Sequence, residues 1–233
     1  MSEQSPPVPS SSTGPAAAWT GRGTTVPTRL LLLRHGQSPL SVQRRYSGRG
    51  NPSLTEDGRS QATAAATTIA VRHVGESGRI RAVVSSPLDR ATQTAEPVAG
   101  VLGLPVEVDE RFTETDFGGW EGLTFPEAAE RDPDLHRAWL ADPSVAPPGG
   151  ESFDAVTARV GAGLDALLAA HAGETVVLVS HVTPIKTLLR FALDAGPSLL
   201  YRLHLDLACL SVVDFWPDGG ASVRLVNDTS YLA

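Results

Sequence analysis

The chain has 233 residues, of which 41% are hydrophobic and 19% charged, the proportions of an ordinary globular protein long enough to bury a core. Its formal net charge of −7 argues against a basic surface for nucleic acid or anionic membranes, and we expect neither as a partner. With a single cysteine, no apolar run of membrane-spanning length and no signal peptide, we expect a cytoplasmic protein without an intramolecular disulfide.

Residues 1–28 are mostly Ser, Pro, Thr, Ala and Gly, and Trp19 is the one aromatic residue among them. Such a segment buries too little apolar surface to offset the entropy cost of ordering it. We therefore expect a disordered tail or linker over residues 1–28, followed by one folded domain over residues 29–233.

The folded region alternates between strand and helix patterns. Four consecutive leucines at residues 30–33 predict a strand that helices cover on both faces. Similar apolar runs predict strands at residues 80–84, 104–108 and 175–179, and a hairpin at the sheet edge over residues 205–215 and 221–226. Helices are expected at residues 55–75, 87–102, 125–140 with a break at Pro133, 153–168 and 185–192. This alternation predicts an α/β fold, a three-layer α/β/α sandwich with a mainly parallel sheet.

Polar residues follow three of the predicted strands. Arg34 and His35 follow the first, Arg90 lies after the second, and His181 follows the fourth. Singly, each of these residues has an ordinary structural explanation as a surface or core side chain. Because the carboxyl ends of parallel strands meet at one edge of a sheet, we expect all four to converge in a ligand site.

The motifs around these residues resemble a known family. Leu33-Arg34-His35-Gly36, the Ser85–Arg90 segment, Glu114 in its glycine-rich loop and Val179-Ser180-His181 resemble the histidine phosphatase superfamily, in its phosphoglycerate-mutase-like branch 1. More narrowly, residues 45–50, 181–186 and 201–206 look like the phosphatase half of actinobacterial bifunctional ribonuclease H/acid phosphatases, which are akin to α-ribazole phosphatases. In those proteins a flexible linker precedes the phosphatase, and residues 1–28 would be that linker or a vestige of it.

The resemblance implies a role for each of the converging residues. His35 would be the nucleophile that forms a phosphohistidine, and Glu114 would protonate the leaving alcohol and then activate water. Arg34 and Arg90 would bind the phosphoryl oxygens, since guanidinium groups match them bidentately, and His181 would donate a hydrogen bond beside them.

The resemblance also implies substrate contacts in the loop after His35. Ser47, Gly48 and Arg45 look like further substrate or phosphate contacts. Ser41 stands where mutase relatives carry an Asn that contacts phosphate, so that contact is expected to be weakened or replaced. No metal or other cofactor is implied, because arginines do the neutralising and the chain has no dense set of metal ligands.

The resemblance implies a metal-independent histidine acid phosphatase that acts on a small soluble phosphate ester. The narrower resemblance makes α-ribazole 5′-phosphate a candidate substrate, and a broad acid-phosphatase range of esters is the other possibility. A phosphoglycerate mutase is an alternative, although the chain lacks the long basic insertion that mutases carry after the Glu114 motif. A catalytically inactive binding module of the same fold is a second alternative.

Three further expectations concern the sheet edge, the mouth of the substrate site, and the remaining histidines and tryptophans. An exposed edge strand over residues 205–215 would offer a surface for pairing into a homodimer. A weaker hypothesis places four residues at the mouth of the substrate site: Phe117, Leu123, Phe125 and Trp139. We interpret the remaining histidines and three tryptophans as structural: His73, His136, His171, His204, Trp120, Trp139 and Trp216.

Overall fold

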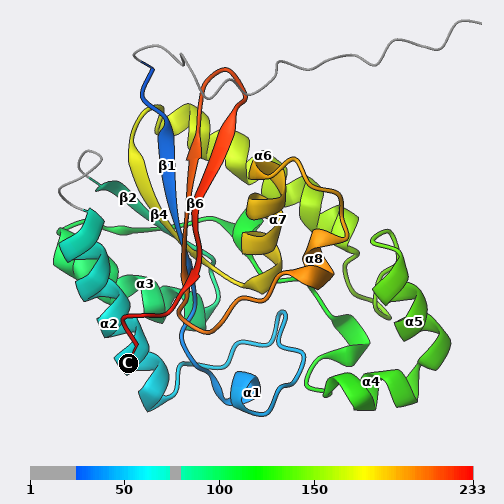
Figure 1. Ribbon diagram of the computed structural model, residues 1–233. Helices are drawn as coiled ribbons and strands as arrows, with labels where there is room; N and C mark the ends of the chain where they lie inside the picture. The colour runs from blue at the N-terminus through cyan, green and yellow to red at the C-terminus, as the bar shows by residue number, and fades with distance from the viewer. Residues whose placement is uncertain (1–24, 74–79, 233) are drawn as a thin grey trace, which may run out of the picture.

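The computed structural model describes residues 25–73 and 80–232, so most of the predicted N-terminal tail lies outside the described residues. Six strands form one sheet in the order β3-β2-β4-β1-β5-β6 (Figure 1). The strands are β1 (Thr28–Arg34), β2 (Ile80–Ser85), β3 (Val106–Val108), β4 (Thr175–Ser180), β5 (Leu210–Phe215) and β6 (Ala221–Asp228). The first four are parallel to one another, and β5 and β6 add an antiparallel hairpin beside β1.

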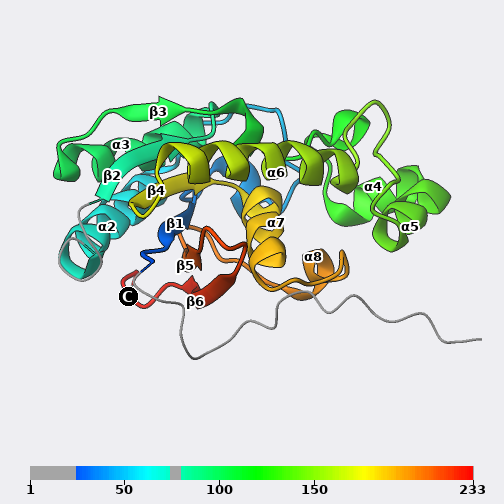
Figure 2. The same cartoon turned by 90° about the horizontal axis from the view of Figure 1, so that it is seen from above.

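Helices cover both faces of this sheet (Figure 2). On one face lie α2 (Glu56–His73) and α3 (Asp89–Leu102), and on the other lie α6 (Phe153–Ala170) and α7 (Val182–Ala192). The shorter elements are α1 (Pro39–Val42), α4 (Phe125–Arg131), α5 (Pro133–Ala141), α8 (Leu199–Arg202) and the 3₁₀ turns η1 (Glu110–Phe112) and η2 (Gly118–Trp120). The predicted three-layer α/β/α architecture is confirmed, as is the helix break at Pro133.

The leucines of β1 explain why the sheet is covered on both sides. Leu30 and Leu32 pack with α6 and α7, whereas Leu31 and Leu33 pack with α2 and α3, and all four are fully buried. Successive side chains of a strand point to opposite faces, so an unbroken apolar run requires two helical layers. The strand that carries Arg34 to the site is thereby held in the middle of the core.

An aromatic cluster supports the lobe formed by α4 and α5. Tyr46, Trp120, Trp139 and Phe153 are buried together there, and the Tyr46 hydroxyl lies 3.0 Å from Nε2 of His136. The structural interpretation of Trp120 and His136 is therefore confirmed. Burial raises the pKa of the Tyr46 hydroxyl, which keeps that group neutral.

Several predicted element boundaries differ from the structure. Strand β3 begins at Val106 rather than at residue 104, and α7 begins at Val182 rather than at residue 185. Helix α3 begins at Asp89, because Leu88 is extended and the side chain of Asn51 accepts a hydrogen bond from the Asp89 amide at 2.7 Å. Arg90 consequently lies in the first turn of α3 rather than one turn inside it.

The predicted edge strand over residues 205–215 is wrong. Strand β5 lies between β1 and β6, all six of its residues are buried, and its hydrogen bonds are used on both sides. The edge on that side is β6 instead. Residues 210–215 therefore offer no free strand for a second subunit, and the homodimer stays an untested prediction.

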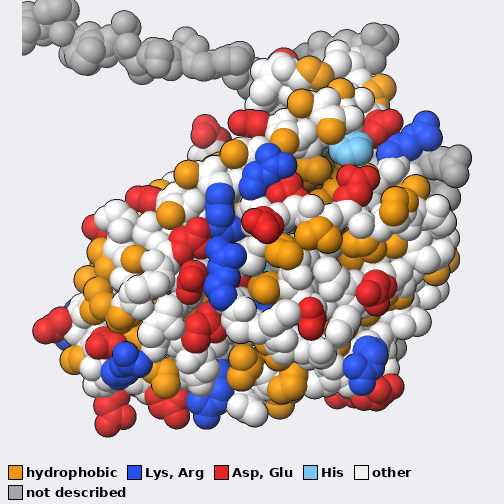
Figure 3. Space-filling view, turned by 180° about the vertical axis from the view of Figure 1, so that it is seen from behind, with side chains coloured by type: hydrophobic (Ala, Val, Ile, Leu, Met, Phe, Trp, Pro, Cys, Tyr) orange, Lys and Arg blue, Asp and Glu red, His pale blue; other side chains and the backbone are white. Residues whose placement is uncertain are grey.

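Two observations on the described residues concern membrane spans and the distribution of surface charge in this chain, whose formal net charge is −7. No helix within residues 25–73 or 80–232 combines the length and apolarity that a membrane crossing requires. On the face seen in Figure 3, Lys and Arg side chains alternate with Asp and Glu, and no broad basic area forms.

Candidate active site

The carboxyl ends of β1, β4 and β2 lie side by side and bring the predicted residues together. In the sheet register Arg34 is opposite Ser180, and Ser85 is opposite Val179. His35 and His181, each directly after its strand, therefore meet, with their ring centroids 5.1 Å apart. Arg90 reaches the same place from the first turn of α3, and its charge acts on both histidines.

The surroundings of His35 fix its tautomer and its charge. Its Nδ1 lies 2.7 Å from the carbonyl oxygen of Gly36, and since a carbonyl only accepts, Nδ1 carries the proton and Nε2 keeps its lone pair. Burial, then the charges of Arg34 and Arg90, hold the pKa of His35 well below its usual 6.5. The imidazole is therefore neutral and nucleophilic at Nε2.

Gly36 is required for the turn that orients His35. A Cβ at this position would lie 2.5 Å from the carbonyl oxygen of Gly58, near the start of α2, so only glycine lets the two backbones approach this closely. The Gly36 amide also donates to the Thr94 hydroxyl at 3.0 Å. These contacts hold the carbonyl that orients the His35 ring.

His181 is fully buried at the N-terminus of α7. Its Nε2 lies 2.7 Å from the hydroxyl of Ser86, whereas Nδ1 has no partner among the described residues. Burial, followed by the charge of Arg90, lowers the pKa of His181 well below 6.5. Ser86 was not predicted as a site residue, although its place directly after β2 is the same signal that identified the two histidines.

The half-buried Arg34 and the fully buried Arg90 supply two cations beside His35. Nη1 of Arg34 donates to the carbonyl oxygen of Leu205 at 2.6 Å, and Arg90 donates to the carbonyl oxygens of Ser47, Gly48 and Gly50 at 2.8–2.9 Å. Both arginines retain a buried Nε without a partner among the described residues. Burial lowers the pKa values of both arginines, that of Arg90 to about 10, so the Arg90 guanidinium keeps its charge at neutral pH.

Glu114 reaches the site from the loop after η1. The residue is 5% exposed, and its carboxylate accepts hydrogen bonds from the Thr115 amide at 2.8 Å and the Thr183 amide at 3.3 Å. Thr183 lies in the first turn of α7, so one helix terminus positions both His181 and Glu114. A carboxyl group at this place can exchange a proton with a substrate held against His35.

A large cavity opens over these groups. Its volume is about 1270 Å³, far more than a phosphoryl group needs, and Arg34, His35 and Glu114 are in its wall. Of the predicted mouth residues, Phe117, Phe125 and Trp139 line it and Leu123 does not. Aromatic walls of this kind suit the apolar part of an organic ligand.

The predicted substrate contacts are only partly directed at this cavity. Ser47 lines it with a buried hydroxyl that has no partner among the described residues. Ser41 lines it but its hydroxyl donates to the Ser38 carbonyl at 2.7 Å. Arg45 lines it while its Nη1 donates to the Gly122 carbonyl and the Glu127 carboxylate at 2.7 and 2.9 Å.

Gly48 acts through its backbone. Its amide donates to the Glu121 carboxylate at 2.9 Å, its carbonyl accepts from Arg90, and a Cβ here would lie 2.1 Å from the Thr115 carbonyl oxygen. Gly48 therefore stabilises the loop over residues 47–50, whose carbonyl oxygens accept hydrogen bonds from Arg90.

Three further cavity residues were not predicted from their own patterns. Lys186 and Asp206 line the wall, and so does His204, which was interpreted as structural. Nε2 of His204 is exposed and lies 3.0 Å from Oδ1 of Asp206. The motif that contains residues 201–206 signalled the region without indicating which side chains face the cavity.

The described residues contain no group of three or more His, Cys, Asp or Glu side chains that could hold a metal ion, and independence from metal remains a prediction. Cys209 is buried, and its backbone carbonyl accepts a hydrogen bond from the Arg34 amide. Burial raises the pKa of its thiol to about 11.

Comparison with known proteins decides the family. The family model described as histidine phosphatase superfamily (branch 1) matches residues 30–229. The chain belongs to this superfamily. The resemblance seen in its motifs is thereby confirmed, and the residues that the superfamily match covers include every side chain described above.

Among three relatives of this superfamily member, two carry phosphatase names. The Mycobacterium tuberculosis "Bifunctional protein Rv2228c" is 64% identical over 215 residues, which are 92% of this chain and 57% of that protein, so this chain spans little more than half of it. An adenosylcobalamin/alpha-ribazole phosphatase of Salmonella typhimurium is 30% identical over 85% of this chain and 96% of its own length. A solved mycobacterial glucosyl-3-phosphoglycerate phosphatase in complex with VO3 is 32% identical, with a TM-score of 0.77 over 87% of this chain and 100% of its own.

Proposed function

We propose that this histidine phosphatase is a metal-independent phosphomonoesterase that works through a phosphohistidine on His35. The observation that carries the proposal is the fixed tautomer of a neutral His35 in the wall of a large cavity. Arg34 lies in the same wall, and the charge of the buried Arg90 also acts on His35. Those cations neutralise the phosphoryl oxygens by position and charge, which is the main need of phosphoryl transfer.

The reaction follows in two displacements. Nε2 of His35 attacks phosphorus, the bond between phosphorus and the ester oxygen breaks, and Glu114 gives a proton to the departing alcohol. Glu114 then takes a proton from water, whose oxygen attacks phosphorus while the N–P bond breaks, and inorganic phosphate leaves. The two arginines and His181 stabilise the charge in both steps.

The loop after Glu114 favours hydrolysis over mutase chemistry. Only residues 121–124 separate η2 from α4, so no long basic segment covers the cavity at this point. A mutase must hold a second phosphate while the first is on the enzyme, whereas a hydrolase needs the cavity open to water.

The alcohol part of the substrate is proposed from the wall of the cavity. Phe117, Phe125 and Trp139 offer apolar surface large enough for an organic group beyond the phosphate, which suits α-ribazole 5′-phosphate or a broad range of esters. The relative named as an alpha-ribazole phosphatase supports α-ribazole 5′-phosphate as the substrate. A broad acid-phosphatase range of esters is the alternative.

The test is a panel of phosphate esters, α-ribazole 5′-phosphate included, assayed in EDTA with wild type, His35→Ala and the control His171→Ala. His171 precedes β4 at the opposite end of the sheet from the site and pairs with Glu174. We expect turnover and a trapped phosphohistidine in wild type and His171→Ala, and neither in His35→Ala. Turnover by His35→Ala would refute the mechanism, and a folded wild type inert on every ester would favour the inactive binding module.

A further inference from the structure

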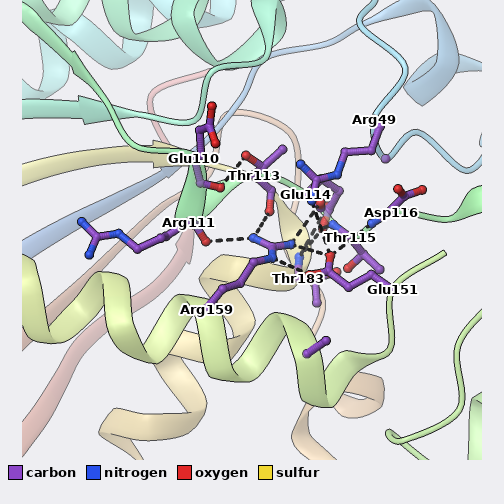
Figure 4. Close-up of polar contacts among 12 residues, drawn as sticks. Arg49, Glu110, Arg111, Thr113, Glu114, Thr115, Asp116, Glu151, Arg159 and Thr183 are labelled. Atoms are coloured by element: carbon purple, nitrogen blue, oxygen red, sulfur yellow. Dashed lines mark hydrogen bonds and ion pairs between the residues drawn. The ribbon is translucent and has the colours of Figure 1, made fainter.

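Arg159 of α6 uses all of its hydrogen-bonding capacity next to the site (Figure 4). Its Nη1 donates to the carbonyl oxygens of Arg111 and Thr113 at 2.8 and 2.6 Å, and its Nη2 donates to that of Glu114 at 3.1 Å. Nε and Nη2 also donate to the two carboxylate oxygens of Glu151, at 2.7 and 2.9 Å. A guanidinium has five N–H groups, and this one directs each of them at a partner.

These hydrogen bonds fix the segment that carries Glu114, the proposed general acid. Three of the five go to backbone carbonyls of residues 111–114, and the other two go to Glu151, in the turn before α6. Glu151 in turn holds the residues after Glu114, since its amide donates to the Asp116 carbonyl at 2.8 Å and Oε2 accepts from the Asp116 amide at 3.4 Å. Arg159 and Glu151 thus hold the chain on both sides of Glu114.

We propose that Arg159, oriented by Glu151, is a positioning residue that sets where the Glu114 carboxyl group meets the leaving oxygen of the substrate. The inference rests on the proposed function, because it assigns Glu114 as the proton donor. Arg159 lines no part of the cavity, and its contact with the proposed proton donor is through the backbone carbonyl of Glu114. Its charge also contributes to the lowered pKa of His181, and Arg159→Lys retains that charge. Lysine cannot replace it, since an ammonium has three donors and lacks the planar fork.

Replacement of Arg159 should therefore lower kcat/KM by a factor that depends on the leaving group of the ester. A displaced general acid matters most where the departing oxygen is basic and matters little where it leaves readily as an anion. The ratio kcat/KM includes the step that expels the alcohol but excludes the later hydrolysis of the phosphohistidine. A variant that is merely less well folded loses kcat/KM by the same factor on every ester.

The experiment compares kcat/KM for phenyl phosphate and p-nitrophenyl phosphate, which differ chiefly in the basicity of the leaving oxygen. We would measure wild type, Arg159→Lys, Glu151→Gln, Glu114→Gln and the double variant Arg159→Lys/Glu114→Gln. Arg29→Lys is the matched control, because Arg29 also pairs bidentately with a carboxylate, that of Asp214, and both arginine side chains are 18% exposed. Arg29 lies at the start of β1, at the opposite end of the strand from Arg34.

We expect Arg159→Lys to lose about a hundredfold on phenyl phosphate, the size of effect that a misplacement of about 1 Å causes, and far less on p-nitrophenyl phosphate. Glu114→Gln should show the same selectivity, and the double variant should add nothing to it. Arg29→Lys should leave the ratio of the two esters unchanged. If Arg159→Lys does not fold, Glu151→Gln tests the same selectivity with a smaller change.

Equal losses on both esters in the folded Arg159 and Glu151 variants would overturn the inference while leaving the proposed function intact. So would a double variant whose selectivity is the product of the two single effects. Failure of the proposed function looks different: wild type would then hydrolyse neither ester and form no phosphohistidine.

Discussion

Lowering the pH from 7.5 to 5.5 should destabilise this protein through its buried histidines. The charges of Arg34 and Arg90, together with burial, hold the pKa of His35 well below 6.5 in the folded state, whereas the unfolded chain returns to about 6.5. Below that pH the unfolded state binds the extra proton, so stability falls as the pH falls. Each histidine that stays neutral in the folded protein lowers the free energy of unfolding by about 1.4 kcal/mol between pH 7.5 and pH 5.5. His181 contributes a similar amount to that of His35.

Urea denaturation of wild type and His35→Asn at the two pH values isolates the contribution of His35. The variant should lose less stability than wild type by about 1.4 kcal/mol, because one titrating group is gone. His181 and His136 are present in both proteins, and burial, the largest cause of the lowered pKa of each, is retained in the variant, so their contributions largely cancel in the comparison. Equal losses in the two proteins would refute the reasoning, since His35 would then be protonated in the folded state.

Other expected outcomes test the same site. The midpoint of the acidic limb of the kcat/KM profile should lie below pH 6.5, because the lowered pKa of His35 keeps the nucleophile neutral down to that lower pH. An acidic limb centred at pH 6.5 would contradict this. Arg90→Lys should reduce the free energy of unfolding by about 1–3 kcal/mol in urea, since it leaves carbonyl partners of the 47–50 loop unpaired. Gly48→Ala should cost about 1–3 kcal/mol, because its Cβ would meet the Thr115 carbonyl, whereas Gly100→Ala in α3 has open space and should stabilise by about 0.5–1 kcal/mol in the same melts. Wild-type turnover in EDTA should match turnover with added Mg²⁺, and restoration of activity by Mg²⁺ alone would count against metal independence.

The layers of the fold were predictable because their signals are local. Four leucines in a row specify a strand buried on both faces, and Pro133 specifies a break between two helices, whatever the rest of the chain does. The convergence of His35 and His181 was also predictable, because parallel strands bring their carboxyl ends together without reference to any side-chain contact.

Contacts between distant segments were not predictable. The start of α3 depends on Asn51, the guanidinium of Arg45 is directed to Glu127, and Arg159 meets the backbone of Glu114 only after α6 has packed. Each of these partners is chosen by the tertiary arrangement, so the sequence around the residue carries no trace of it. The position of β5 inside the sheet is of the same kind, because a buried strand and an edge strand of similar composition differ only in what lies beside them.

The state of Cys209 has a consequence for how the proposed activity responds to oxidants. Peroxide attacks thiolates, and a buried thiol whose pKa is about 11 is almost entirely protonated at neutral pH. An enzyme whose nucleophile is a cysteine thiolate can be switched off by oxidation of that one sulfur. Here the proposed nucleophile is an imidazole, and the chain's one cysteine is kept in its unreactive form, so turnover should continue through an oxidative burst that silences thiolate-dependent phosphatases.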